Sequence, residues 1–251
     1  MHSSVKRFLT ILNRALPLTE CRCGACGRIA PHSDLKGGSS LCQDCRNALF
    51  DAASAPCPGC GQFPTAPQTV PTLCGECRRK PRPWRRVIVC GPYSGRLKDL
   101  VLQYKFNQRL DLGRQLQECA LAAYTTAMQR FQDMQGPELI IPVPLHGRRL
   151  LGRGFNQAKE IGRLLSSRMG AAIEQRALER VRRTVPQMRL ARAERATNIA
   201  GAFAAKKELV CGKRILLIDD IMTTGSTLEE CTRVLLAAGA SEVDVLVLAR
   251  A

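Results

Sequence analysis

The chain has 251 residues, of which 45% are hydrophobic, and this length allows one large core or two smaller ones. Its 38 lysines and arginines outnumber its 21 acidic residues, which gives a net charge of +17 and a pI near 9.8. No apolar stretch reaches the roughly 18 residues of a membrane span, and the start of the chain lacks the pattern of a secretory signal. We therefore expect a soluble, cytoplasmic protein with reduced thiols and an anionic partner.

The positive charge is concentrated in one segment of the chain. Residues 146–195 include 13 lysines and arginines but only 4 acidic residues. A patch of this kind favours a nucleic acid or a phosphorylated small molecule as partner, although solubility alone would also account for a basic surface.

The first 83 residues differ in composition from the rest of the chain. A short amphipathic helix is expected before Pro17, with an apolar face made by Val5, Phe8, Leu9, Leu12 and Leu16. Paired cysteines, glycines and prolines follow, and the segment 81–83 reads as a boundary. We predict two domains, with the N-terminal helix and a cysteine-rich region in residues 1–83 and a second domain in residues 84–251.

The cysteine-rich region contains four Cys-x-x-Cys units. Their members are Cys23 and Cys26, Cys42 and Cys45, Cys57 and Cys60, and Cys74 and Cys77. Two such units complete the tetrahedral thiolate shell of structural zinc, whereas redox dithiols normally come singly. Four thiolates leave no open position, so a catalytic zinc is not expected. The spacing fits both sequential and interleaved pairing of the units.

Other residues near these units have simpler interpretations. Gly27, Gly61 and Gly75 fit the tight turns of zinc knuckles, and Cys21 and His32 are expected to be bystanders. The cysteines beside apolar runs are expected in the core, and they are Cys90, Cys119, Cys211 and Cys231.

After residue 84, apolar strands alternate with helices. Strands are expected over 87–93, 139–143, 215–218 and 242–249, and helices over 95–106, 111–131, 156–169 and 227–238. This alternation predicts an α/β fold with a mostly parallel sheet flanked by helices.

The run ILLIDDIMTTGSTLEE, residues 215–230, carries the strongest candidate site. A buried strand leads into Asp219 and Asp220, and then into a hydroxyl-rich turn over residues 223–227, here called the phosphate loop. Ligands bind at the carboxyl edge of such sheets, and the N-terminus of the following helix favours a phosphate. The two acids can accept hydrogen bonds from sugar hydroxyls or hold Mg²⁺ through water. The alternative is an ordinary strand-to-helix turn with a Ser or Thr cap.

This run resembles the phosphoribosyl-pyrophosphate motif of type I phosphoribosyltransferases. The resemblance implies that Asp219 and Asp220, the catalytic acidic pair, contact the ribose, while the phosphate loop holds its 5′-phosphate. The binding site it implies comprises Asp219, Asp220, Ile221, Met222, Thr223, Thr224, Gly225, Ser226 and Thr227.

A basic loop follows the strand expected over 139–143 and should reach the same sheet edge. In the phosphoribosyltransferases that it resembles, a loop at this edge meets pyrophosphate, which implies this role for His146, Arg148, Arg149 and Arg153. For His146, a structural role within the loop is the alternative. A second basic stretch could close over a ligand, track a nucleic-acid backbone or be a solvated helix face. It comprises Arg182, Arg183, Gln187, Arg189, Arg192, Arg195 and Asn198.

The Cys-x-x-Cys units, the stretch VPLHGRRLLGRGFNQAKEIGRLL and the acidic-pair motif together resemble the ComF/GntX family of competence-associated, phosphoribosyltransferase-like proteins. The resemblance implies a type I phosphoribosyltransferase-like sheet preceded by a zinc-binding region, and a link to DNA uptake or to the use of external DNA.

Two functional hypotheses follow. In the first, phosphoribosyl pyrophosphate bound with Mg²⁺ loses pyrophosphate as an unidentified acceptor attacks the ribose. In the second, the protein is a non-catalytic component that binds single-stranded DNA or another DNA-uptake protein.

Overall fold

The computed structural model describes residues 20–31, 40–49, 54–66, 68–106, 109–145, 155–182, 184 and 194–251. Several residues singled out from the sequence lie outside this part of the chain. They are the N-terminal helix before Pro17, His32, His146, Arg148, Arg149, Arg153, Arg183, Gln187, Arg189, Arg192 and the side chain of Arg195.

The centre of the fold is a five-stranded parallel sheet, as the sequence predicts. Its order is β3-β9-β8-β4-β5. The strands are β3 (Val87–Pro92), β9 (Glu242–Arg250), β8 (Arg214–Met222), β4 (Leu139–Pro142) and β5 (Ala172–Ile173).

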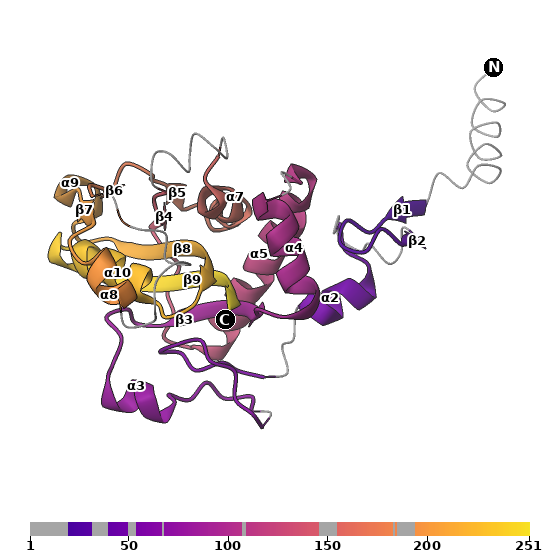
Figure 1. Cartoon of the computed structure of the whole chain (residues 1–251), viewed down its shortest axis with the longest axis horizontal. Coiled ribbons are helices and arrows are strands. Elements are labelled where there is room, and N and C mark those ends of the chain that lie inside the picture. Colours follow the sequence, from indigo (N-terminus) through magenta and orange to yellow (C-terminus); the bar gives the residue numbers. More distant parts are fainter. Residues whose placement is uncertain are drawn as a thin grey trace, which may run out of the picture.

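Helices cover both faces of the sheet (Figure 1). Along β8, Leu216 and Ile218 pack toward one group of helices, whereas Ile215 and Leu217 pack toward the other, because successive side chains of a strand point to opposite faces. The first group is α4 (Gly95–Phe106), α5 (Gly113–Arg130) and α7 (Gln157–Met169), and the second is α8 (Glu194–Ile199), α9 (Lys207–Val210) and α10 (Ser226–Ala237). Within the described residues, no helix is both long and apolar enough to cross a membrane.

The ends of the elements follow local chemistry. The Asn156 side chain accepts hydrogen bonds from the backbone N–H groups of Ala158 and Lys159 and so caps α7, which ends at Gly170 in the left-handed region. The helix predicted over 111–131 is shorter, because a 3-10 turn, η2 (Leu110–Leu112), precedes α5.

The strand predicted over 215–218 is too short. β8 continues through Asp219 and Asp220 to Met222, since β9 keeps pairing with it up to the contact between Met222 and Arg250. The acidic pair therefore belongs to the end of the strand and not to the loop that follows it.

Short elements without a clear sequence period were missed. The described residues include two antiparallel pairs, β1 (Glu20–Arg22) with β2 (Ile29–Pro31) and β6 (Leu178–Arg180) with β7 (Phe203–Ala205). In the described part of the cysteine-rich region, the structure adds the short helices α2 (Gln43–Leu49) and α3 (Gly75–Arg79).

The cysteines outside the paired units mostly behave as expected. Cys90, Cys119 and Cys231 are buried. The prediction for Cys211 is wrong, because it follows the short helix α9 at the surface and is exposed.

Candidate functional site: a sheet-edge crevice and two cysteine clusters

The order of the strands creates a crevice between β4 and β8. From β4 the chain runs through α7 to β5 on one side, whereas from β8 it runs through α10 to β9 on the other. These two connections lie on opposite faces of the sheet (Figure 1). The carboxyl ends of two such strands form a topological switch point, where open α/β sheets bind their ligands.

The acidic pair lies at this point. Pairing of β4 with β8 stops at Pro142 opposite Ile218, so the last residues of β8 extend past β4. The backbone N–H of Asp220 donates to Asp219 Oδ1 at 2.8 Å, and that of Ile221 donates to Asp220 Oδ1 at 2.7 Å. One oxygen of each carboxylate therefore holds the local backbone and fixes the direction of the side chain.

Lys105 approaches the acidic pair from α4. Its Nζ lies 2.6 Å from Asp220 Oδ2, and the two side chains are only 19% and 16% exposed. Sequence reasoning missed this residue, because Lys105 belongs to no motif and lies far from Asp220 along the chain. The only signal available was its position beside Tyr104 on the inward face of a predicted helix.

The environment of Asp219 raises the pKa of its carboxyl to about 7. Burial is the largest cause and the neighbouring charge of Asp220 adds to it, while the backbone N–H of Asp220 and the charges of Lys105 and Arg180 oppose the shift. Near neutral pH this carboxyl therefore changes between a proton donor and an acceptor for hydroxyl groups.

The phosphate loop makes a sharp turn into α10. Gly225 has a φ of 84°, a left-handed conformation that favours glycine, and it caps the helix. The hydroxyl oxygens of Thr224 and Ser226 lie 2.9 Å apart, and the Ser226 backbone N–H donates to Thr224 Oγ1 at 3.4 Å. The turn thus places hydroxyl groups at the N-terminus of a 12-residue helix, where the free backbone N–H groups favour an anion.

The loop after β4 begins and ends at the same edge of the sheet. Asn156 Nδ2 donates to the Val143 carbonyl at 3.1 Å, and the Val143 backbone N–H donates to the Ile218 carbonyl at 2.9 Å. The ring of Phe155 packs edge-on against Tyr104, with centroids 5.4 Å apart. The four residues expected to meet pyrophosphate lie between these anchors, outside the described ranges.

Arg182 from the second basic stretch contacts backbone. Its Nη2 donates to the carbonyls of Asn198 at 3.0 Å and Ala200 at 2.6 Å. These bonds use part of its guanidinium to hold the segment before β7.

The cysteines of the first two Cys-x-x-Cys units form one cluster, here called the N-terminal cluster. All four sulfur atoms of Cys23, Cys26, Cys42 and Cys45 lie within 4.8 Å of one another. Cys26 Sγ and Cys42 Sγ are 3.9 Å apart, close to the separation of about 3.8 Å expected for a tetrahedron with 2.3 Å zinc–sulfur bonds. The chain turns at Gly27, whose φ is 72°.

The cysteines of the other two Cys-x-x-Cys units form a similar cluster, here called the second cluster. Cys57, Cys60, Cys74 and Cys77 lie within the same 4.8 Å limit, and Cys60 Sγ is 3.7 Å from Cys74 Sγ. Gly61, with a φ of 70°, supplies the turn, whereas Gly75 begins α3, so the knuckle role predicted for Gly75 is wrong. The structure thus decides for sequential pairing of the units.

In each cluster, one thiol has a pKa below the ordinary value of a cysteine. Burial opposes ionisation of Cys23, but backbone N–H groups of Cys42, Cys26 and Ala25 lower its pKa to about 6. A hydrogen bond from Cys60 is the largest cause that lowers the pKa of Cys57 to about 4. Metal ligation requires thiolates, so both clusters could hold a metal ion.

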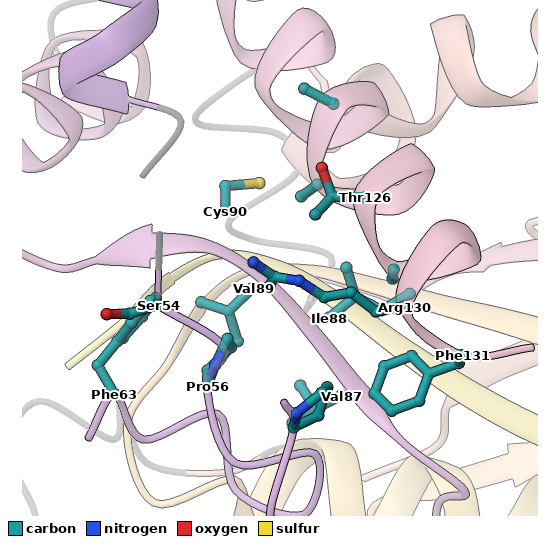
Figure 2. A pocket seen from close by; sticks show the side chains of 14 residues that line it. Ser54, Pro56, Phe63, Val87, Ile88, Val89, Cys90, Thr126, Arg130 and Phe131 are labelled. Carbon is teal, nitrogen blue, oxygen red and sulfur yellow. The ribbon is translucent and has the colours of Figure 1, made fainter. Parts of the chain in front are cut away.

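A further cleft lies away from this edge, between β3, α5 and the segment 54–71 (Figure 2). Its wall is mainly apolar, with Arg130 among the side chains that line it, and none of the described residues in the lining carries a carboxylate. Among the described residues, the acidic pair and the hydroxyl-rich turn lie at the β4–β8 crevice and not at this cleft.

Comparison with known proteins identifies the class of the fold. Residues 150–251 match the family described as "Phosphoribosyl transferase domain". Together with the parallel sheet and the acidic pair at its edge, this match defines the C-terminal part of the chain as a phosphoribosyltransferase domain.

The relatives identify the family more closely. The chain is 36% identical over 210 residues to "DNA utilization protein YhgH" of Salmonella typhimurium. The aligned region covers 84% of this chain and 90% of the relative. It is 32% identical over 222 residues to "Competence protein F" of Haemophilus influenzae, with coverages of 84% and 96%. The chain belongs to the ComF/GntX family.

Among solved structures, a Bacillus subtilis glutamine phosphoribosylpyrophosphate amidotransferase is similar, with 18% identity and a TM-score of 0.39. The match covers 59% of this chain and 30% of that enzyme.

Proposed function

We propose that the chain binds phosphoribosyl pyrophosphate with Mg²⁺ in the β4–β8 crevice and transfers the phosphoribosyl group to an acceptor. The observation that carries this proposal is the position of Asp219 and Asp220 at the switch point, directly before a hydroxyl-rich turn at the N-terminus of α10. A ribose and its 5′-phosphate would bind across these two features.

Each part of the crevice has a separate role. The carboxylates of Asp219 and Asp220 accept hydrogen bonds from the ribose hydroxyls. The phosphate loop donates to the 5′-phosphate, and Ile221 and Met222 connect the two parts. The pyrophosphate lies toward the loop after β4, where His146, Arg148, Arg149 and Arg153 supply donors and positive charge. Lys105 joins this set and balances the negative charge of the acids and the ligand.

The reaction needs no protein nucleophile. The bond between the anomeric carbon and the pyrophosphate oxygen breaks, pyrophosphate leaves with the electron pair, and a lone pair of the acceptor forms the new bond. The bound Mg²⁺ supplies charge neutralisation to the leaving group. Asp219 and Asp220 hold the ribose in place while positive charge develops on the sugar.

We further propose that both cysteine clusters hold structural Zn²⁺. The sulfur separations and the backbone N–H donors to Cys23 and Cys57 support this assignment. Four thiolates carry more negative charge than the ion neutralises. The Arg96 guanidinium, 2.7 Å from Cys45 Sγ, offsets part of this excess at the N-terminal cluster.

Calorimetry tests the function directly. Phosphoribosyl pyrophosphate is titrated with Mg²⁺ into the zinc-loaded wild type and into the double variant Asp219→Asn, Asp220→Asn. A matched control carries Asp99→Asn and Asp111→Asn, which remove two exposed carboxylates from the same protein. We expect saturable binding in the wild type and the control, and its loss in the first variant. Absence of binding by a folded, zinc-loaded wild type would contradict the proposal.

A second candidate function is binding of single-stranded DNA or of a DNA-uptake protein. It is favoured by the names of the relatives, which refer to DNA utilization and competence, and by the net charge of +17. Anisotropy of a labelled oligonucleotide tests it. If phosphate contacts dominate, the logarithm of the binding constant falls linearly with the logarithm of the salt concentration. The two Asp→Asn changes should leave this binding unaffected.

A further inference from the structure

The second cluster lies next to the turn that leads from β8 into α10. In Figure 1, α3 is found beneath α10 and β3, whereas β1, β2 and α2 of the N-terminal cluster lie at the opposite side of the molecule. Three side chains, those of Arg82, Trp84 and Arg250, connect the second cluster with residues 222–225.

Arg82 contacts both α3 and the phosphate loop. Its Nη2 lies 4.0 Å from Glu76 in α3, between the ligand positions of Cys74 and Cys77. Its Nη1 forms an ion pair with Glu229 of α10 and lies 3.5 Å from the Thr224 carbonyl oxygen. The side chains of Arg82 and Glu229 are only 14% and 21% exposed, so water screens this ion pair weakly, whereas Glu76 is 61% exposed.

Trp84 spans the same gap with a rigid ring. Its Nε1 donates to the Gly59 carbonyl at 2.8 Å, and Gly59 lies in the knuckle between Cys57 and Cys60. Its Cη2 is 3.4 Å from the position that a Cβ on Gly225 would occupy. The ring is 4% exposed, so a shift of the knuckle would move an atom packed against the phosphate loop.

Arg250 makes the third connection. Its Nε donates to the Cys60 carbonyl at 2.8 Å, and its Nη1 lies 3.4 Å from the Met222 carbonyl oxygen. One guanidinium therefore holds the backbone of a cysteine ligand and the backbone at the end of β8.

We propose that the second cluster supports the phosphate loop, with Arg82 and Trp84 as positioning residues that transmit the order of the metal-loaded knuckle to residues 222–225. The consequence for phosphate binding rests on the proposed function, whereas the consequence for the order of the loop does not.

The N-terminal cluster has a different setting. Its described contacts run to α4 and α5, through Arg96 and through Glu118, which accepts from the Ser40 backbone N–H at 3.3 Å.

Hydrogen exchange of the ligand-free, zinc-loaded protein measures the order of the loop. For Arg82→Met we expect about tenfold faster exchange in peptides covering residues 222–227, the effect of losing hydrogen bonds to a charged group. Arg82→Lys should restore part of the protection. Arg85→Met is the matched control. Arg85 lies in the same segment as Arg82, but it pairs with Asp133 and Glu242 and not with the phosphate loop or α10.

A second comparison separates the clusters. Cys74→Ser should lose one zinc and accelerate exchange in residues 222–227, whereas Cys26→Ser should lose one zinc without this effect. If Arg82→Met does not fold, Trp84→Phe tests the same support, because it removes the donor to Gly59 and keeps most of the ring.

The outcomes are distinct. If the folded Arg82→Met and Cys74→Ser proteins show unchanged hydrogen exchange in residues 222–227, the proposal that the second cluster supports the phosphate loop is wrong. Faster exchange together with about tenfold weaker binding of phosphoribosyl pyrophosphate would confirm it and its functional consequence. Faster exchange in a protein whose wild type does not bind this ligand would confirm the support and refute the proposed function.

Discussion

Lys105 Nζ on α4 lies 2.6 Å from Asp220 Oδ2 on β8, so one partly buried ion pair connects the helix after β3 with the acidic pair. The other oxygen of Asp220 accepts from the Ile221 backbone N–H. Asp220 is thus held from two sides before any ligand binds. Pre-positioned carboxylates and cations of this kind lose little freedom on binding, which favours affinity for a charged sugar phosphate.

Replacement of Lys105 should weaken this site. We expect Lys105→Met to reduce affinity for phosphoribosyl pyrophosphate by about tenfold or more, because a largely buried carboxylate loses its partner and the ligand loses a nearby cation. Calorimetry with Mg²⁺ measures the change. Lys98→Met, which removes an exposed lysine from the same helix, should bind like the wild type. Equal affinities of both variants would exclude a role for Lys105.

Binding should also depend on pH through Asp219. Its pKa of about 7 lies above the ordinary value of about 3.9, so only the higher-pH form is the carboxylate that accepts sugar hydroxyls. From pH 6 to pH 8 the ionised fraction rises about tenfold, and affinity should rise with it.

The control for this pH profile is Asp219→Asn, which retains the titration of the ligand's own phosphates but should lose the dependence due to Asp219.

Stability should change in the opposite direction. The folded protein retains this proton to higher pH than the unfolded chain, so stability of the ligand-free protein falls as pH rises from about 4 through 7. Chemical denaturation at several pH values measures this fall, and Asp219→Asn should reduce it.

Gly225→Ala should damage the phosphate loop. The φ of 84° disfavours any Cβ, and the added atom would lie 2.8 Å from Met222 Cε. We expect a loss of about 1–2 kcal/mol in the free energy of unfolding and weaker ligand binding. Gly136→Ala is the control, because a Cβ there meets no heavy atom within 4 Å. Equal effects of the two changes in denaturant titrations would argue against a strained loop.

The paired cysteines should bind two zinc ions per chain. Metal analysis of the purified protein should find about two equivalents, since each closed tetrahedral site takes one ion. Cys57→Ser or Cys23→Ser should each reduce the content to about one, because the clusters share no ligand. Loss of both ions on a single substitution in a protein that remains folded would indicate a shared site.

Local patterns in the sequence were sufficient for much of the fold. The helix over 95–106 was predicted with its observed bounds, because its apolar spacing and flanking residues lie within one short segment. The end of β8 was missed because pairing with β9, and not the residues at 219–222, extends the strand. The exposed position of Cys211 was missed because neighbouring apolar residues do not reveal which turn reaches the surface.

The sequence by itself determined the parts of this protein whose residues are close along the chain: the four Cys-x-x-Cys units, the acidic pair and the phosphate loop. Their chemistry depends on spacing within a turn, which the order of residues sets directly. Only the tertiary structure decided which cysteine units pair, that Lys105 meets Asp220, and that Arg82 reaches Thr224 across 142 residues. Such contacts depend on how strands order and helices pack, and no local period encodes that arrangement.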